Sequence, residues 1–506
     1  MAKSYPYQYL NTRIKSEEYV ERRETLMAHM ADNSIAILPS ATLQIRSNDT
    51  EYKFRQDSDF NYLTGFLEPD SVLVLVPGRE KGEVIYFCRE KDPDKELWDG
   101  YREGPEGLCA SYGADDAFPI NDIDDILPGL LESRERVYYA MGRRPEFDQR
   151  IMNWLNALRA TARNGSHPPG EFSDLNHLLH DMRLFKSRPE LKLMQAAADI
   201  SCMAHNHAMA TCEPGMYEGQ LEAEYLHQFG VRGAPAAAYN TIVGAGANAC
   251  VLHYVENNQK ISDGDLVLVD AGCEFQSYAS DISRTFPANG KFTKAQQAIY
   301  EIVLEAQYAA IDATVAGNHW DDPHNQSVRV IGQGLLDLGL LEGDLNEIIE
   351  TEKYKEFYMH RVGHWLGMDV HDVGDYKICD EWRVLESGMV MTVEPGIYIS
   401  PSNKGVKAKW RGIGIRIEDN VVVKRKGNDV ITSAAVKTVA DVEKQMAKAR
   451  TSKSSKNKLG VSKAKKSVQK KARAKKASPK TKASKKTLAK KIKTKKRAAI
   501  KKRKKS

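Results

Sequence analysis

The chain has 506 residues and a formal net charge of +6, but its charges are distributed very unevenly. Residues 451–506 contain 26 Lys or Arg and no Asp or Glu, so residues 1–450 hold the other 48 basic and all 68 acidic side chains, a net charge of −20. The hydrophobic fraction of 42% excludes a fully disordered chain, and apolar runs such as 71–77 are far shorter than the roughly 18 residues that cross a bilayer. We therefore interpret an acidic globular body and a cationic tail separately.

The N-terminus and the cysteines indicate the cellular setting. The N-terminal residues contain no apolar segment, so we expect no secretory signal, and we expect no transmembrane segment elsewhere. The seven cysteines are scattered, include no CxxC pair and are odd in number, which argues against a disulfide scaffold. These features predict a reducing, cytoplasmic location.

The first part of the chain alternates helical and strand signals. Apolar spacing predicts an amphipathic helix at 17–32, and short apolar runs predict strands at 34–38, 71–76 and 83–88. Such alternation is typical of an α/β layer domain.

A composition change divides the chain into three parts. The stretch 160–172 contains Asn164-Gly165 and Pro168-Pro169-Gly170, which is typical of a linker. We place an N-terminal domain at 1–180, a second domain at 181–445 and a Lys-rich tail at 446–506.

The second domain combines long helices with strand-rich segments. Helices are predicted at 189–212 and at 293–315, where Thr293 and Gln296 form a capping box. Residues 265–287 are predicted as two strands joined by a polar turn. Further strand-rich segments lie at 388–399 and 412–424. The pattern indicates an α+β domain with helices packed on an antiparallel sheet.

The tail consists of Lys, Ala, Ser and Thr with almost no large apolar residues. It cannot bury enough surface to offset the entropy of ordering, so we expect it to be disordered. Two interpretations stay open: a solvated extension without a partner, or binding of nucleic acid or another polyanion through residues 451–506.

Four carboxylates lie at the ends or in the interior of apolar strand segments. They are Asp270, Asp281, Glu394 and Glu418. If 265–287 pairs as a hairpin, Asp270 and Asp281 can face the same side of the sheet. Burying such acids as unpaired anions is costly, and a bound cation removes that cost. The alternative is that each is an ordinary turn or strand-edge residue.

His364 lies between Gly363 and Trp365 and can add a nitrogen ligand. Four carboxylates and one imidazole form an oxygen-rich set that suits Mn²⁺ better than a structural zinc. So many carboxylates can hold two divalent metal ions with a bridging hydroxide between them.

The order of these five residues resembles the ligand signature of the pita-bread metallopeptidases, which include methionine aminopeptidase, prolidase and aminopeptidase P. The strings DGDLVLVDAGCEFQSYASDISRTFP, HWLGMDVHDVG, TVEPGIYI and RGIGIRIEDN are close to those of the bacterial aminopeptidase P branch. The resemblance covers 1–445 and excludes the tail. It implies an α/β N-terminal creatinase/aminopeptidase P-type domain followed by an α+β pita-bread catalytic domain.

The resemblance also implies how the ligands divide. Asp270 would chelate one metal ion, while Asp281 and Glu418 would bridge both. His364 and Glu394 would hold the other ion, and Glu394 would also accept a proton from the attacking water.

Other residues match the substrate cleft and the surroundings of the metals. His253, His360 and His371 match histidines that bind the scissile carbonyl, stabilise the oxyanion and contact the proline side. Arg416 resembles a residue that supports the ligands, and we expect it on the same face as Glu418 and paired with Asp49. Trp98 resembles an aromatic that closes the cleft of a neighbouring subunit, in a dimer or tetramer.

The activity implied is hydrolysis of the bond between an N-terminal residue and a following proline. Prolidase, which cleaves only Xaa-Pro dipeptides, is the alternative within the family, and the first-domain string RQDSDFNYLTGF favours aminopeptidase P. A chromatin-binding protein with an inactive peptidase body is the alternative from another class, and the intact ligand set argues against it. Of the other histidines, His205 is expected at the surface or satisfied in the core, and His324 in a loop.

Overall fold

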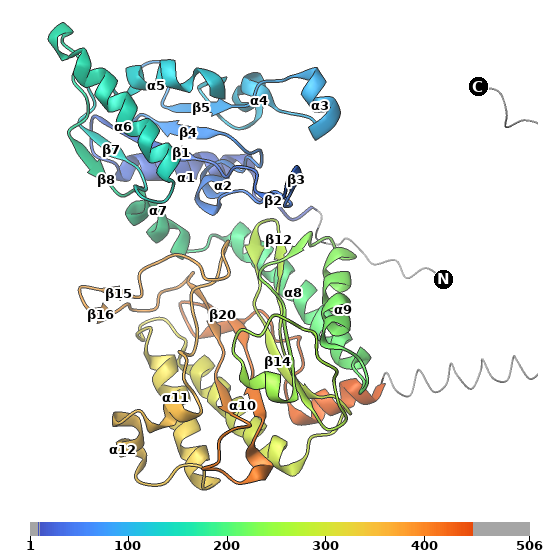
Figure 1. Cartoon of the computed structure of the whole chain (residues 1–506). Coiled ribbons are helices and arrows are strands. Elements are labelled where there is room, and N and C mark those ends of the chain that lie inside the picture. Colours follow the sequence, from blue (N-terminus) through green and yellow to red (C-terminus); the bar gives the residue numbers. More distant parts are fainter. Residues whose placement is uncertain (1–8, 10, 449–506) are drawn as a thin grey trace, which may run out of the picture. The chain divides into compact units, whose positions relative to one another are not determined.

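The computed structural model describes residue 9 and residues 11–448 (Figure 1). The predicted disordered tail lies, from residue 449 onward, outside the described residues. No described helix has the length and apolarity that a membrane crossing requires.

A six-stranded mixed sheet forms the N-terminal part, in the order β6-β5-β4-β1-β7-β8. Its strands are β1 (Ser34–Pro39), β4 (Val72–Leu75), β5 (Val84–Cys88), β6 (Asp116–Pro119), β7 (Arg136–Tyr138) and β8 (Glu171–Ser173). The β1–β4 and β4–β5 pairs are antiparallel, whereas β1–β7, β5–β6 and β7–β8 are parallel. A small hairpin of β2 (Ile45–Ser47) and β3 (Thr50–Glu51) stands beside it.

Helices cover both faces of this sheet (Figure 1). The helices of this part are α1 (Ser16–His29), α2 (Ser58–Thr64), α4 (Gly104–Ser111), α5 (Ile123–Leu131), α6 (Pro145–Ala160) and α7 (Leu175–Leu184), and α3 (Pro93–Asp99), which buries no residue. Because side chains alternate along a strand, Ile35 and Ile37 of β1 pack with α5 and α6, while Ala36 and Leu38 belong to the core that includes α1 and α2. The predicted helix and the three predicted strands are confirmed, as is the α/β class.

The stretch 160–172 differs from the expected linker. It connects the end of α6 to β8, an edge strand that pairs with β7. Arg136 of β7 and Glu171 of β8 form an ion pair at 2.6 Å across this edge. The Pro- and Gly-rich signal therefore marks a turn inside the N-terminal sheet.

Besides a helical segment at 439–448, the second part contains five labelled α-helices and several short antiparallel sheets among the described residues. The helices are α8 (Arg188–Thr211), α9 (Glu218–Gly230), α10 (Lys294–Ala313), α11 (Asp322–Asp337) and α12 (Leu345–Glu350). The strands of its sheets are β9 (Ala236–Ala237), β10 (Ile242–Ala245), β11 (Leu266–Asp270), β12 (Cys273–Phe275), β13 (Tyr278–Ala279), β14 (Ser283–Pro287), β15 (Lys377–Ile378), β16 (Glu381–Trp382), β17 (Val390–Val393), β18 (Gly396–Ile399), β19 (Ile413–Arg416), β20 (Asp419–Val423) and β21 (Asn428–Val430).

The helices pack on the antiparallel strands as predicted. Ile299 and Val303 of α10 and Ile331 of α11 share one core with Ile397 of β18 and Ile415 of β19. The capping box of α10 is present, because the Thr293 hydroxyl accepts from the Gln296 amide at 3.3 Å and the Gln296 side chain accepts from the Thr293 amide at 2.9 Å. The helices predicted at 189–212 and 293–315 are confirmed as α8 and α10.

The segment 265–287 contains more than the predicted pair of strands. β11 and β14 pair antiparallel as expected, with β10 on the other side of β11. The expected turn is instead a second hairpin, β12–β13, which belongs to a different sheet with β9. Gly272 permits this crossing, since a Cβ there would collide with the carbonyl oxygen of Ser280.

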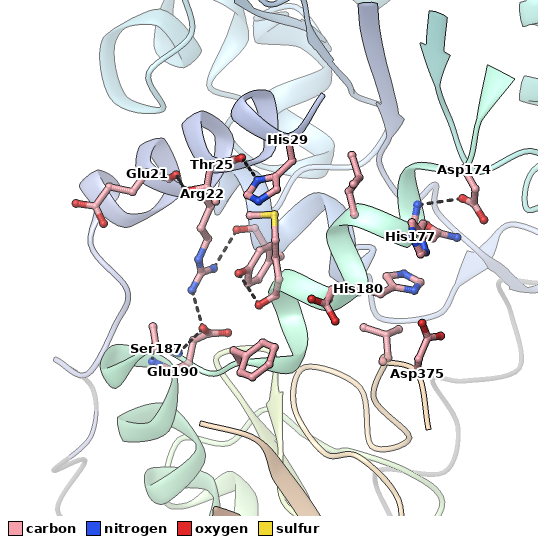
Figure 2. A pocket seen from close by; sticks show the side chains of 18 of the residues that line it. Glu21, Arg22, Thr25, His29, Asp174, His177, His180, Ser187, Glu190 and Asp375 are labelled. Carbon is pink, nitrogen blue, oxygen red and sulfur yellow. Dashed lines mark hydrogen bonds and ion pairs between the residues drawn. The ribbon is translucent and has the colours of Figure 1, made fainter. Parts of the chain in front are cut away.

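A groove of about 1240 Å³ lies beside α1 and α7 (Figure 2). Many of its charged side chains are paired with one another. Arg22 contacts Glu18 at 2.5 Å and Glu190 at 3.3 Å, and Arg383 contacts Asp181 at 2.6 Å. The five predicted metal ligands line a different cavity.

Candidate metal centre and active site

The five predicted ligands line one cavity of about 410 Å³. Asp270 ends β11, and Asp281 lies two residues before β14. His364 is in the loop before β17, Glu394 directly follows β17, and Glu418 lies between β19 and β20. Strand ends from separate sheets therefore place all five side chains around one space.

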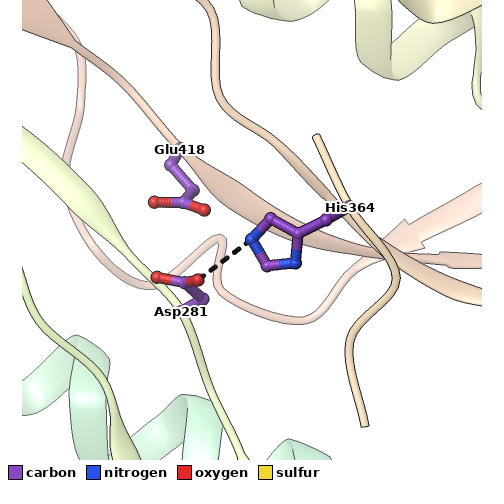
Figure 3. A group of neighbouring side chains, drawn as sticks. All are labelled: Asp281, His364 and Glu418. Carbon is purple, nitrogen blue, oxygen red and sulfur yellow. Dashed lines mark ion pairs between the residues drawn. The ribbon is translucent and has the colours of Figure 1, made fainter. Parts of the chain in front are cut away.

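Three of the five form a compact group (Figure 3). Asp281, His364 and Glu418 each offer a ligand atom, and these atoms lie within 4.8 Å of one another. His364 Nε2 is 3.3 Å from Asp281 Oδ2 and 3.6 Å from Glu394 Oε1. The group has the donor atoms and the spacing that a metal ion requires.

The carboxylates oppose one another electrostatically. Burial, together with the neighbouring charge of Asp281, raises the pKa of Asp270 to about 6. Burial raises the pKa of Glu394 to about 7, and burial with the charges of Asp281 and Glu394 raises the pKa of Glu418 well above its usual value. Burial also acts on Asp281, but the hydrogen bond and charge of His364 keep its pKa below the usual value. Such a set of crowded oxygen donors fits divalent metal ions, whose charge favours the ionised carboxylates.

Tyr239 joins two of the acids and was not predicted. Its hydroxyl oxygen is 2.6 Å from Asp270 Oδ1 and 2.5 Å from Asp281 Oδ1. The residue lies in the loop before β10, inside the string YNTIVGAGANACVLHY, where no periodicity distinguishes it. The resemblance to the bacterial aminopeptidase P branch also extends over this string, and that was the available signal.

Arg416 supports the acids from one side. Its Nη2 donates to Asp270 Oδ2 at 2.7 Å, and its Nε donates to Ser283 Oγ at 2.8 Å. The Ser283 hydroxyl in turn donates to Glu418 Oε2 at 2.8 Å, so Arg416 and Glu418 share a face as expected. The expected pairing with Asp49 is wrong, because Arg416 is buried and Asp49 is exposed in the β2–β3 turn.

The three predicted cleft histidines line the same cavity. His360 Nε2 is 2.9 Å from the Tyr398 hydroxyl oxygen, and burial followed by the charge of Arg416 lowers the pKa of His360 to about 3. The His371 ring meets the His364 ring edge-on at 4.3 Å, and burial followed by the charge of His364 lowers the pKa of His371. His360 is therefore neutral near pH 7.

A buried acid holds the loop that carries His253. Glu218, at the start of α9, accepts hydrogen bonds from the amides of Ala245 and Gln259, both at 2.8 Å. It also accepts from Asn248 Nδ2 at 3.0 Å and from the hydroxyl of Tyr254 at 2.8 Å. Residues 245–259 are thereby tied to α9, which sequence reasoning did not predict.

Two glycines allow chain segments to touch behind the cavity. A Cβ at Gly363 would collide with the carbonyl oxygen of Thr392, and a Cβ at Gly414 would collide with that of Ala249. The crowding is steric, and neither position has a positive φ.

The other histidines lie outside the cavity. His205 is fully buried and satisfied, with Nε2 2.9 Å from the Ala271 carbonyl oxygen and Nδ1 3.0 Å from the Tyr225 hydroxyl oxygen, as expected for a core histidine. The expectation of a loop position for His324 is wrong, because it lies buried in α11.

Two family models match this chain. Metallopeptidase family M24 matches residues 192–425, and the aminopeptidase P N-terminal domain matches residues 19–138. The chain is 44% identical to the Xaa-Pro aminopeptidase of Haemophilus influenzae over 435 residues, covering 86% of this chain and 98% of the relative. It is 43% identical to the Xaa-Pro aminopeptidase of Escherichia coli K12 over 438 residues, covering 86% and 99%.

Solved structures of similar proteins share the fold. Aminopeptidase PepP of Pseudomonas aeruginosa is 60% identical, with a TM-score of 0.86 over 87% of this chain and 100% of that one. A zinc-substituted aminopeptidase P of E. coli in complex with product is 43% identical, with a TM-score of 0.84 over 86% and 99%. The similarity extends over nearly all of the described residues and beyond the metal-binding segments.

Proposed function

The chain belongs to metallopeptidase family M24 and is a metal-dependent Xaa-Pro aminopeptidase, and we propose how its residues divide that work. The observation that carries the proposal is the convergence of Asp270, Asp281, His364, Glu394 and Glu418 on one cavity that three histidines also line.

The metal centre holds two divalent ions, which we propose to be Mn²⁺. Asp270 would hold one ion, His364 and Glu394 would hold the other, and Asp281 and Glu418 would contact both. The oxygen-rich donor set and the raised pKa values of Asp270, Glu394 and Glu418 support a site for divalent cations, and the resemblance to the pita-bread metallopeptidases supports the division. When bound, the ions acidify water and supply a nucleophile near neutral pH.

The remaining steps belong to side chains of the cavity. Glu394 accepts the proton of the attacking water, a role that suits a carboxylate lining the same cavity as the other ligands. His253, His360 and His371 bind the scissile carbonyl, stabilise the oxyanion and contact the proline side of the peptide. Arg416 orients Asp270 directly and Glu418 through Ser283.

The substrate is tested by comparing an Xaa-Pro-Yaa tripeptide with an Xaa-Pro dipeptide in the presence of Mn²⁺. We expect release of the N-terminal residue from the tripeptide. Activity on the dipeptide alone would instead assign a prolidase and overturn the proposal.

Single substitutions test which residues bind metal and which bind substrate. Asp281→Ala and Glu418→Ala should abolish turnover and lose bound metal, as measured by elemental analysis. His253→Ala and His371→Ala should lower turnover and keep the metal content. Substantial activity in either acid variant contradicts the two-metal centre.

We also propose a homo-oligomer, dimer or tetramer. Trp98 and its neighbours Leu97 and Tyr101 are 84%, 82% and 95% exposed, an apolar surface on and just after α3 that a second subunit would cover. Light scattering of the parent and of Trp98→Ala tests this, and a parent that is monomeric at assay concentrations excludes it.

We also propose that the domains meet at residue 180, that the second domain ends at residue 445, and that the protein is cytoplasmic. The last proposal concerns the tail. We infer that residues 451–506 bind nucleic acid, because 26 positive charges without one acid would displace counterions from a polyanion. Truncation to 1–445 should abolish a strongly salt-dependent affinity for DNA and leave peptidase activity intact. Retained affinity would refute the inference, and binding only to anionic vesicles would assign a membrane surface instead.

A further inference from the structure

One wall of the cavity is fastened from behind by buried charges. Residues 366–372 form the loop that carries His371, and Arg183 lies near the end of α7 beneath it. We propose that Arg183 is a positioning residue for His371: its guanidinium ties this loop to the N-terminal sheet domain and keeps the His371 ring beside His364. The inference rests on the proposed function, in which His371 contacts the substrate.

Arg183 holds the loop at two points. Its Nη2 donates to Asp369 Oδ2 at 2.8 Å and to Asp372 Oδ1 at 2.6 Å. Lys186 Nζ donates to the other Asp372 oxygen at 2.8 Å. Because Asp372 directly follows His371, a fixed Asp372 carboxylate restricts the backbone from which the His371 ring projects.

The other arm of the same guanidinium reaches the N-terminal domain. It donates to Asp59 Oδ1 in α2 at 2.6 Å. Two residues just before Asp59 reinforce the contact, since Arg55 Nη2 donates to the Met368 carbonyl oxygen at 2.8 Å and Ser58 Oγ donates to Asp369 Oδ1 at 2.6 Å. The N-terminal domain thus contacts the loop directly through Arg55 and Ser58, and indirectly through Asp59 and Arg183.

The ion pairs of Arg183 are buried, and their burial restricts the loop to one arrangement. The side chains of Arg183, Asp59 and Asp372 are only 2%, 0% and 1% exposed. Removing one partner from such a network leaves an uncompensated buried charge, so the loop has no equivalent solvated alternative. A surface ion pair would impose no such restriction.

Arg383 offers a matched control. It is also a buried arginine in an ion pair, with Asp181 at 2.6 Å, but Asp181 belongs to α7 and not to the loop. Arg383→Met therefore removes a buried arginine from an ion pair, although Asp181 is 56% exposed, without releasing residues 366–372.

The test is a double-mutant cycle on the metal-loaded enzyme with the Xaa-Pro-Yaa substrate. Arg183→Met should lower kcat/KM about 10- to 100-fold, because displacing a substrate-contacting group by about 1 Å has effects of that size. In a His371→Ala background the same change should have less than about a threefold effect, since the group that it positions is gone. Arg183→Lys should restore part of the activity, and Arg383→Met should stay within about twofold of the parent.

Equal effects of Arg183→Met with and without His371 would overturn the proposal, because Arg183 would then act elsewhere. If Arg183→Met does not fold, Asp369→Asn decides, since that side chain is 35% exposed and its loss leaves Asp59 and Asp372 paired. Asp369→Asn should lower kcat/KM in the parent but not in His371→Ala, and no effect in the parent would count against the proposal. An inactive metal-loaded parent would instead contradict the proposed function.

Discussion

Tyr239 connects Asp270 and Asp281, two carboxylates of the proposed metal centre, through one hydroxyl group. A group that hydrogen-bonds a metal ligand fixes the direction in which the ligand presents its free oxygen. Tyr239 therefore orients Asp270 and Asp281 towards the cavity without itself being needed as a ligand.

Tyr239→Phe should weaken metal binding about 10-fold or more, because the two acids lose their common donor. Titration of the metal-free protein with Mn²⁺ against a competing chelator measures the change. Tyr225→Phe is the control, since it removes a buried hydroxyl that contacts His205 and should leave the metal affinity unchanged. Equal affinities of Tyr239→Phe and the parent would contradict the role.

His205 makes folding sensitive to pH. Burial lowers its pKa to about 3, whereas the unfolded chain has a histidine pKa of about 6.5. Below about pH 6.5 the unfolded state binds the proton and the folded state does not, so the stability that this residue contributes is complete above that pH and is lost as the pH falls towards 3.

From pH 7.5 to 5.5 this one residue should lower the free energy of unfolding by about 1.4 kcal/mol. Urea unfolding of the parent and of His205→Gln at both pH values measures it. The variant should show a pH dependence that is smaller by this amount, and an identical dependence in the two proteins would rule out the assignment.

Two segments of the active site, 245–259 and 366–372, are each held by buried carboxylates. Glu218 serves the first and Asp372 the second. Hydrogen bonds to these buried carboxylates restrict the backbones that carry His253 and His371.

Glu218→Gln should destabilise the protein by about 1–3 kcal/mol. The Glu218 carboxylate accepts four hydrogen bonds, and in the variant an NH₂ group, which can only donate, takes the place of one of its two oxygens. It should also lower kcat/KM through the displaced His253. Thermal unfolding and tripeptide kinetics measure the two effects. Glu222→Gln, which alters a single hydrogen bond with Asn257, should have a smaller effect on the stability and on kcat/KM. Equal effects of the two variants would contradict the role of Glu218 in holding residues 245–259.

Elements with a strong local signal could be predicted from the sequence. The run 266–269 predicted β11, the capping box predicted the start of α10, and the family resemblance supplied the residues that meet in the cavity. The β12–β13 hairpin was missed, because strands of two and three residues show no periodicity. The contacts of Arg416, Tyr239 and Glu218 were missed for another reason: each joins residues distant in sequence, which local patterns do not record.

At the scale of the whole molecule, the metal centre links the strands of several sheets. Its proposed ligands lie next to the ends of β11, β14, β17 and β20, which belong to two different sheets, and in the loop before β17. An ion that binds only the folded state stabilises it by mass action and also relieves repulsion among the carboxylates.

Removal of metal with a chelator should therefore lower the Tm, and added Mn²⁺ should restore it. A metal concentration about 1,000 times the Kd corresponds to about 4 kcal/mol. Differential scanning fluorimetry measures the shift. Asp281→Ala should show no rise in Tm with Mn²⁺, and a rise equal to that of the parent would place the stabilising ion elsewhere.

Steric crowding at three glycines limits which codon changes the gene can tolerate. A base change in the first or second position of a glycine codon replaces glycine by a residue that has a Cβ, unless it creates a stop codon. At Gly272, Gly363 and Gly414 that Cβ would collide with a carbonyl oxygen of a neighbouring segment. Each collision displaces a backbone on which metal ligands or the cleft depend, an overpacking that costs about 1–3 kcal/mol or more. In a randomised library selected for activity, these three codons should accept only synonymous changes, while the exposed β2–β3 hairpin varies freely.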